Sequence, residues 1–273
     1  MHLLVTTGGS AHSTIAVQFS SELAKITASS VTVLTVIKHA HDQARAEEIL
    51  AAAVSVLQTA VSPPHTKIRI GHPAEEIVRE AEEGSCDLII LGEHAEHSLL
   101  TRLFGPVSQQ VVDHSTRPVL IAKKTAVPIR HLLLCDSGVR TPSLLNRVKN
   151  KLPHLLAAAD TVTVLHVMSQ MSAMPGVPGK QLRATADELI ADHTPEGELL
   201  ERDVHILEQM DVQPQPLVRH GLVVDEIVAE ASRGNYDLVV IGAHRHENMP
   251  SFLLDDLAQQ IIRQIDRAVL IVQ

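Results

Sequence analysis

Short aliphatic runs alternate with longer amphipathic segments along most of the chain. The runs are short enough for strands, and the segments between them repeat apolar positions with the spacing of a helix. This alternation predicts parallel strands joined by right-handed helical crossovers, with helices on both faces of the sheet. In the first half, the predicted strands are residues 3–7, 31–37, 66–70, 87–92 and 118–122.

Two segments illustrate the predicted helices. Segment 72–84 has Pro73 where a first turn would lie, apolar residues on one face, and Gly84 where the helix should end. Segment 41–58 is acidic and rich in alanine, so we expect a helix that covers the sheet and has one solvated face.

The second half of the chain repeats the first. When the chain is shifted by 150 residues, Gly71–Ile121 aligns with Gly221–Ile271 without a gap, and 18 of the 51 aligned positions are identical. Upstream, residues 31–36 match residues 162–167 at an offset of 131, which leaves 150 − 131 = 19 additional residues in the second copy. Such self-similarity indicates a duplicated structural unit.

The length and the repeat together predict two domains of the same fold. We expect the first domain at residues 1–124 and the second at residues 129–273, with the additional residues inserted near 169–198. Each domain is predicted to be an α/β unit, a flavodoxin-like doubly wound sheet of five parallel strands in the order 3-2-1-4-5.

In such a sheet a ligand binds where the strand order reverses, at the carboxyl ends of strands 1 and 4. In the first copy this rule brings residues 6–10 opposite residues 92–97. In the second copy it brings residues 135–138 opposite residues 242–247. Both loops after strand 4 begin with a glycine and continue with histidines and charged residues.

These loops carry the pattern of a known family. In the first copy, Gly92 and Gly105 have the spacing of the motif G-x-x-G, nine residues, then G-[ST], although Ala95 replaces the second glycine and Pro106 replaces the hydroxyl residue. With its duplicated domain, the chain resembles the universal stress protein family in its tandem form. The resemblance implies an adenine nucleotide alpha hydrolase-like fold and a regulatory or stress-response role, without rapid enzymatic turnover.

The resemblance also implies a nucleotide site, ATP or AMP, in the first domain. Glycines in the motif admit the nucleotide backbone, and the helix that follows directs free N–H groups at the phosphates. Gly8 stands where the family has an aspartate after strand 1. The residues implied in binding are Thr7, Gly8, Val36, Gly92, His94, Gly105, Val107 and Ser108.

The second copy departs further from the motif. Asp136 lies within one position of the family's aspartate, and Gly242 is present, but Asp255 and Asp256 occupy the G-[ST] position. Two carboxylates at a helix start would repel a phosphate. In the first copy Glu93 and Glu96 would also oppose a triphosphate, but the spacing is intact, so we expect the nucleotide there.

Two alternatives use other features of the sequence. The chain could be a nucleotide-free module that binds another protein through its surfaces, including the insertion with Met168, Met171 and Met174. It could also be a metal-binding sensor, because imidazole and carboxylate groups suit zinc. The candidate metal ligands are His72, Glu93, His94, Glu96, His97, His220, His244, His246 and Glu247.

Composition restricts the partners. A net charge of −9 and only three Phe, one Tyr and no Trp argue against a nucleic-acid binder. No signal peptide or membrane span is evident, so we expect a cytoplasmic protein, and Cys86 and Cys135 have no metal or redox spacing. Serines near helix starts, such as Ser10, are expected to be caps rather than nucleophiles, since no G-x-S-x-G elbow occurs.

The last strand of each copy raises the question of pairing. Residues 118–122 and 268–273 are aliphatic, and an open aliphatic edge strand promotes aggregation. In the family these edges pair between subunits, so the resemblance implies that the tandem chain pairs its own two edges as an internal pseudo-dimer. A further homodimer is also compatible with the sequence.

Overall fold

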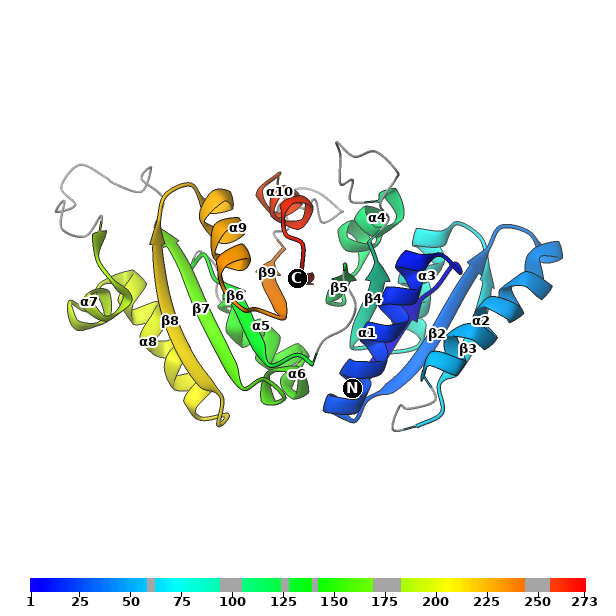
Figure 1. Cartoon of the computed structure of the whole chain (residues 1–273), viewed down its shortest axis with the longest axis horizontal. Coiled ribbons are helices and arrows are strands. Elements are labelled where there is room, and N and C mark those ends of the chain that lie inside the picture. The colour runs from blue at the N-terminus through cyan, green and yellow to red at the C-terminus, as the bar shows by residue number, and fades with distance from the viewer. Residues whose placement is uncertain (58–61, 94–104, 124–127, 139–141, 169–182, 244–255) are drawn as a thin grey trace.

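The structure is a computed structural model, and it describes residues 1–57, 62–93, 105–123, 128–138, 142–168, 183–243 and 256–273. Strands and helices alternate from the N-terminus to the C-terminus (Figure 1). The elements of the first half are β1 (His2–Thr6), α1 (Ala11–Thr27), β2 (Ser30–Ile37), η1 (Ala40–Asp42), α2 (Gln43–Leu57), β3 (His65–Ile70), α3 (Pro73–Glu83), β4 (Leu88–Gly92), α4 (Pro106–His114) and β5 (Val119–Ala122).

The second half follows the same plan with two local differences. A proline at position 153 divides the first helix into two, and α7 is an additional short helix before α8. The elements of the second half are β6 (His131–Cys135), α5 (Leu144–Lys151), α6 (Pro153–Ala157), β7 (Thr161–Met168), α7 (Ala186–Ala191), α8 (Pro195–Glu208), β8 (Gln213–His220), α9 (Val223–Arg233), β9 (Leu238–Gly242), α10 (Asp256–Gln264) and β10 (Ala268–Val272).

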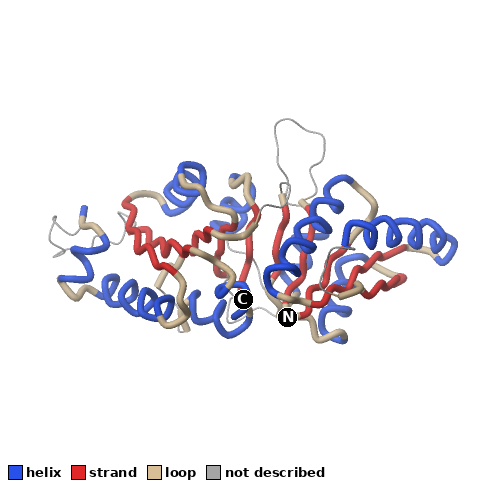
Figure 2. The backbone as a smooth tube through the Cα atoms, turned by 60° about the horizontal axis from the view of Figure 1, so that its bottom comes forward, coloured by secondary structure: helices blue, strands red, loops and turns tan. Residues whose placement is uncertain are grey.

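The strand order confirms the predicted fold class. Among the described residues, ten strands form one sheet in the order β3-β2-β1-β4-β5-β10-β9-β6-β7-β8. Each half is therefore a parallel five-stranded sheet with the order 3-2-1-4-5. The strands are aliphatic because helices cover both faces of such a sheet, which Figure 2 shows.

The two halves meet at their last strands. β5 and β10 pair antiparallel, with Leu120 opposite Leu270, Ile121 opposite Val269 and Val119 opposite Ile271. This confirms the predicted pairing of the two aliphatic edges within one chain. Neither strand is left as an open edge of the sheet.

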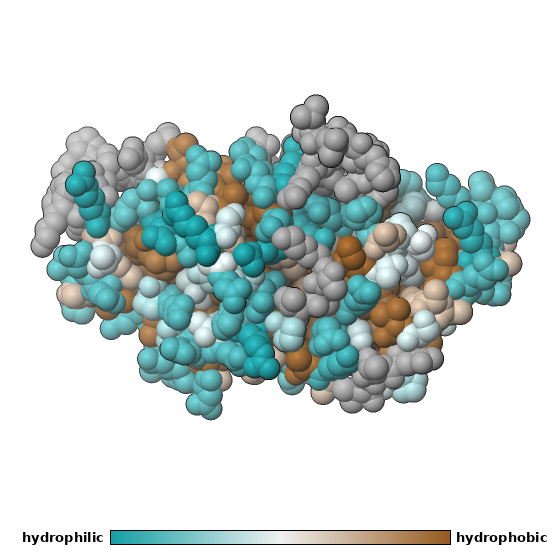
Figure 3. Space-filling model, viewed as in Figure 1, coloured by the Kyte–Doolittle hydropathy of each residue, from teal (hydrophilic) through white to brown (hydrophobic). Residues whose placement is uncertain are grey.

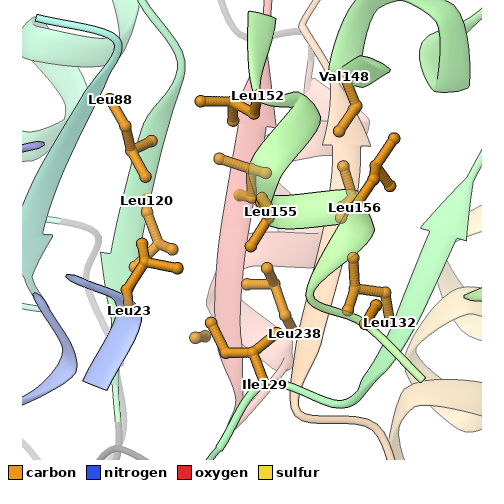
Figure 4. Packing of buried hydrophobic residues seen from close by; sticks show 14 of the residues in the cluster. Leu23, Leu88, Leu120, Ile129, Leu132, Val148, Leu152, Leu155, Leu156 and Leu238 are labelled. Atoms are coloured by element: carbon orange, nitrogen blue, oxygen red, sulfur yellow. The ribbon is translucent and has the colours of Figure 1, made fainter. Parts of the chain in front are cut away.

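Each face of the sheet has a hydrophobic core that runs through both halves. On one face α1, α2, α5, α6 and α8 contribute buried aliphatic side chains, and on the other face α3, α4, α9 and α10 do so. In Figure 4, Leu23 of α1 and Leu155 of α6 belong to the same cluster, although they come from different halves. The seam therefore combines backbone pairing with apolar burial, which stabilises it by roughly 25 cal/mol per Å² of apolar area removed from water.

Local sequence explains where several helices begin. The Ser10 side chain accepts a hydrogen bond from the backbone N–H of Ser13 at 3.2 Å, so it caps α1 as expected. Pro73 starts α3, whose C-terminal cap is Gly84. In the inserted region, Thr185 and Glu188 form a capping box that starts α7; residues 169–182 of that region lie outside the described residues.

On the face drawn in Figure 3, the coloured hydrophobic residues are scattered among hydrophilic ones. No described helix is both long enough and apolar enough to span a bilayer. Among the described residues, the exposed large hydrophobic side chains are Ile26, Ile70, Leu222 and Leu257.

Candidate functional site

In the first half, a short connection joins β1 to α1. Thr7 follows β1 and is buried; its Oγ1 donates to Ser13 Oγ at 3.2 Å and accepts from the Gly9 N–H at 3.3 Å. Residues 7–10 make up the whole connection, so the first turn of α1 lies close to the end of β1.

The first turn of α1 also lies against the end of β4. A Cβ atom added to Gly92 would lie 2.2 Å from the carbonyl oxygen of His12 and 3.0 Å from the nitrogen of Ser13. Gly92 is therefore required for the helix backbone to approach the strand. This packing role explains the glycine without a ligand.

The remaining predicted residues of this half lie on α4 and β2. Gly105 is the buried N-cap of α4, and Ser108 is buried in the first turn of that helix. Val36 and Val107 are half-buried and pack against the same hydrophobic cluster. Gly8 is exposed, whereas His94 lies outside the described residues.

The first turn of α1 thus brings together Thr7, which follows β1, and Gly92, which ends β4. Glu93, which the sequence indicates as an obstacle to a phosphate, is paired with Lys123: the Nζ atom lies 3.0 Å from Glu93 Oε1. The Lys123 side chain is only 2% exposed. The charge of Glu93 is consequently compensated by a buried cation.

In the second half the corresponding strand ends border a cavity of about 340 Å³. It lies at the carboxyl ends of β6, β7 and β9, beneath the first turns of α9 and α10, where the fold class predicts a ligand site. Most of its wall is apolar. The lining residues are Cys135, Asp136, Ser137, Leu144, Arg147, Leu165, His166, Val167, Met168, Glu196, Val223, Ile227, Ile241, Gly242, Leu257, Ala258 and Ile261.

Asp136 organises the base of this cavity. Its Oδ1 accepts from the Gly138 N–H at 2.9 Å and its Oδ2 accepts from the Leu144 N–H at 2.7 Å, the first residue of α5. The carboxylate is buried and lies at a helix N-terminus, where backbone N–H groups stabilise negative charge.

The strand register makes Thr7, rather than Gly8, the first-half equivalent of Asp136. The Asp136 N–H donates to Leu165 O, and the Thr7 N–H donates to Leu34 O, at the same step of the ladder between the first and second strands. The two side chains also accept from the N–H two residues ahead. Gly8 therefore lies one position beyond the structural equivalent of Asp136.

Arg147 supplies a positive charge to the cavity wall. Its Nη1 donates to Val272 O at 3.0 Å, which orients the guanidinium beside the end of β10. A Cβ atom on Gly242 would lie 2.7 Å from Arg147 Nη2, and the nearest atoms around it all belong to this side chain. The glycine after the fourth strand thus faces a cation here, whereas Gly92 faces a helix backbone.

His166 and Cys135 complete the polar part of the wall. Nδ1 of His166, a buried residue on β7, lies 3.1 Å from the backbone carbonyl of Asp136. Burial, with the nearby Asp136 charge, raises the pKa of the Cys135 thiol far above its ordinary range, so the thiol stays protonated.

The connection from the first strand to the next helix is longer in this half. Residues 136–143 lie between β6 and α5, compared with residues 7–10 between β1 and α1. Arg147 and His166 did not emerge from the sequence as site residues. Asp136, which lies within one position of the family's aspartate, is the sequence signal that pointed to the second half.

The alternative of a metal-binding sensor receives no support among the described residues, which hold no cluster of three or more His, Cys, Asp or Glu side chains arranged for a metal. His220 is engaged through Nε2 with the Ala184 carbonyl at 2.9 Å. The other loop ligands proposed from the sequence, His94, Glu96, His97, His244, His246 and Glu247, lie outside the described residues.

Comparison with known proteins supports the resemblance seen in the sequence. The model of the universal stress protein family matches residues 1–123 and again residues 141–273. A universal stress protein of Methanocaldococcus jannaschii is 42% identical over 57 residues, which are 21% of this chain and 35% of the relative. The stress response protein NhaX of Bacillus subtilis is 35% identical over 79 residues, 29% of this chain and 48% of the relative.

The matched segments therefore span less than half of the length of these curated relatives. A solved universal stress protein from Archaeoglobus fulgidus superimposes over 100% of this chain and 98% of its own length, with a TM-score of 0.75 and 17% identity. At that identity the likeness extends to the fold, including the tandem arrangement of the two halves.

Proposed function

This chain belongs to the universal stress protein family, whose model matches both of its halves, and from that premise we propose that it is a stress-response protein that binds an adenine nucleotide in the second half. The observation that carries the proposal is the cavity of about 340 Å³ at the carboxyl ends of β6, β7 and β9. Small-ligand sites in open α/β sheets lie at this switch point.

The cavity wall suits a planar base and a ribose. Leu165, Val223, Ile227 and Ile241 provide apolar surface, and ligand pockets typically combine such surface with a few fixed polar groups. The fixed polar groups here are Asp136 and His166, both held by hydrogen bonds to the backbone.

The charges around the cavity favour a ligand with one phosphate. Arg147 is the cation of the described wall, and it is accompanied by the carboxylates of Asp136 and Glu196. A triphosphate would bring several negative charges to a site whose described wall offers one guanidinium, and like charges at short range repel. AMP therefore fits this wall better than ATP.

The sequence motif implies a site in the first half, formed by Thr7, Gly92 and Ser108. Two observations favour the second half instead. The backbone of α1 occupies the space beside Gly92, whereas the side chain of Arg147 lies beside Gly242. In addition, a cation and a buried carboxylate line the second-half cavity together.

Calorimetric titration of the purified full chain with AMP, ATP and adenosine tests the proposal. We expect AMP to bind, and Arg147→Ala to lower AMP affinity by about tenfold or more, because a hydrogen bond to a charged group contributes roughly 1.5–3 kcal/mol. Adenosine affinity should change little. The matched variant Thr7→Val, at the first-half position equivalent to Asp136, should leave AMP affinity unchanged.

Two results would overturn the proposal. If no adenine nucleotide binds at millimolar concentration, the chain is a nucleotide-free interaction module, the rival function. If Thr7→Val lowers the affinity and Arg147→Ala does not, the nucleotide occupies the first half, as the motif predicts.

A further inference from the structure

The imidazole of His166 uses one ring nitrogen for the fold and leaves the other open to the cavity. Nδ1 lies 3.1 Å from the backbone carbonyl oxygen of Asp136, and a carbonyl oxygen can only accept, so Nδ1 carries the hydrogen. In a neutral imidazole Nε2 is then an acceptor. Among the described residues Nε2 has no hydrogen-bond partner, yet it is not one of the unpartnered atoms that are closed off from solvent. Because His166 lines the cavity, Nε2 is available to a ligand there.

The first half shows that the bond to the carbonyl does not require a histidine. Thr35 of β2 is the equivalent of His166, since the two strands align at an offset of 131 residues. Its Oγ1 donates to the backbone carbonyl oxygen of Thr7 at 3.0 Å, and Thr7 is the equivalent of Asp136. A threonine thus makes the same contact with a side chain that has no further ring nitrogen. The fold therefore accounts for Nδ1 of His166 but not for Nε2.

A second acceptor borders the same end of the cavity. Glu196, in the first turn of α8, is half-buried and lines the cavity. Leu199 follows three residues later on the same face of the helix. Leu199 and His166 both lie against Gly138, where an added Cβ would be 2.9 Å from Leu199 Cδ2 and 3.8 Å from His166 Cε1. An ionised carboxylate only accepts, so this end of the cavity offers two acceptors to a ligand.

The cation of the described wall lies at the opposite end. Arg147 Nη1 donates to Val272 O at the end of β10, and Arg147 Nη2 is the atom nearest to a Cβ placed on Gly242 at the end of β9. β6 lies between β9 and β7, which carries His166. Neighbouring strands are about 4.8 Å apart, so the ends of β9 and β7 are separated by roughly 10 Å. The cavity therefore has a donor at one end and acceptors at the other.

We propose that His166 selects the base of the nucleotide: its Nε2 accepts a hydrogen bond from the exocyclic amino group of adenine, while Arg147 binds the phosphate. This inference rests on the proposed function, because it names the part of AMP that the far end of the site recognises. AMP carries its phosphate and its amino group at opposite ends, which matches the two ends of the cavity. A base with an oxo group at that position would bring a third acceptor to His166 and Glu196 and leave all three unpaired.

Calorimetric titration of the full chain at about pH 8, where an ordinary imidazole is neutral, measures what the amino group contributes. The probes are AMP, purine riboside monophosphate, which has a hydrogen in place of the amino group, and inosine monophosphate, which has an oxo group there. AMP should bind about tenfold more tightly than purine riboside monophosphate, because the latter leaves a buried acceptor unpaired. Inosine monophosphate should bind no more tightly than purine riboside monophosphate. Equal affinities for the three nucleotides would overturn the inference.

His166→Thr removes Nε2 and keeps the bond to the Asp136 carbonyl, as Thr35 does in the first half. AMP affinity should fall by about tenfold, to that of purine riboside monophosphate, whose own affinity should change little. A residue that only supports the fold would lower both affinities by the same factor. An unchanged ratio of the two affinities in His166→Thr would therefore overturn the inference.

Thr35→Val is the matched control in the first half. It removes the bond to the Thr7 carbonyl and should leave the affinities for AMP and for purine riboside monophosphate as they are in the natural chain. If Thr35→Val abolishes the preference for AMP, the amino group is recognised in the first half and the role of His166 is wrong.

The same titrations separate this inference from the proposed function. If none of the three nucleotides binds the natural chain, the proposed function fails, and the role of His166 fails with it. If AMP binds but its preference is absent, or is unaffected by His166→Thr, the proposed function stands and only the role of His166 is wrong.

Nitrogen-15 NMR of labelled histidine tests the inference without a variant, in case His166→Thr does not fold. One imidazole of the natural chain should carry its hydrogen on Nδ1, as the contact of His166 with the Asp136 carbonyl requires. AMP should shift the Nε2 signal of that imidazole, and purine riboside monophosphate should shift it less. If saturating AMP leaves this Nε2 signal unchanged, His166 does not bind the amino group.

Discussion

The ammonium group of Lys123 lies 2.8 Å from the carbonyl oxygen of Ile265, so a side chain that follows β5 in the first half caps the last helix of the second half. The reciprocal contact is present: Nε2 of Gln273, which follows β10, lies 3.5 Å from Val112 O on α4. Cations and amides near a helix C-terminus satisfy its free carbonyl groups. These two contacts therefore help to hold the halves together next to both of the paired strands, β5 and β10.

Replacing Lys123 with Met should destabilise the whole chain. The substitution keeps the apolar stem but removes the charge that Glu93 and the carbonyls of Ile262 and Ile265 share. Breaking a buried ion pair by removing one partner costs about 3–5 kcal/mol, and since Glu93 is 16% exposed, we expect the lower end of that range. Urea unfolding measures the loss.

A double variant provides the control for this pair. Glu93→Gln combined with Lys123→Met leaves no uncompensated charge, so it should recover part of the stability. Losses that simply add in the double variant would show that the two groups do not interact.

Alanine substitutions should destabilise the chain to different extents at Gly92 and Gly242, the two glycines that end β4 and β9. Gly92→Ala should destabilise by about 3 kcal/mol or more, because the new Cβ meets the helix backbone at His12. Gly242→Ala should cost about 1 kcal/mol or less, because it meets the movable end of Arg147. Thermal unfolding measures both, and equal losses would contradict the assigned contacts.

Acid should weaken the ion pairs of α3. Burial alone would raise the pKa of Glu80, but hydrogen bonds from Lys67 and Arg69 lower it below its usual value. A depressed carboxyl pKa stabilises the fold above the unfolded pKa, and that stability is lost as the pH falls through the folded pKa. Glu80→Gln should therefore be less stable near neutral pH by about 1–2 kcal/mol, with a shallower loss below pH 4.

Glu83→Gln is the matched control for Glu80. Glu83 also contacts Arg69, but its side chain is 58% exposed. An exposed ion pair contributes about 0–1 kcal/mol, so this variant should change urea unfolding little. A larger effect from Glu83 than from Glu80 would contradict the role of burial.

Prolines protect the outer strand of the second half. The N–H groups of Gln213 and Gly221 donate toward β7, so the N–H positions that alternate with them face outward. Two of these outward positions are Pro214 and Pro216, which have no N–H. Replacing both prolines with Val should open this edge and produce concentration-dependent self-association, measured by sedimentation velocity. The pair Gln213→Val and Gln215→Val adds similar apolar surface without new outward N–H groups, so it should stay unassociated.

Much of the fold was predictable because its causes are local or repeated. Helix 73–83 follows from a proline, a glycine and one apolar face, and the buried strands follow from short aliphatic runs. The pairing of β5 with β10 followed from the family resemblance and from two aliphatic edges that need cover, and the structure shows that it is antiparallel.

The site was harder to predict, because a motif records residue spacing and not the space left by packing. Gly92 and Gly242 occupy equivalent positions in the repeat, yet one contacts a helix backbone and the other an arginine.

By itself, the sequence determined the duplication, the fold class, the strand order and the family, since periodicity and repeated residues are properties of the chain alone. Only the tertiary structure showed that the described strand ends of the second half border a cavity, and which cation lines it. Those features depend on where long side chains and helix ends meet after folding, and residues far apart in the chain, such as Arg147 and Val272, determine them together.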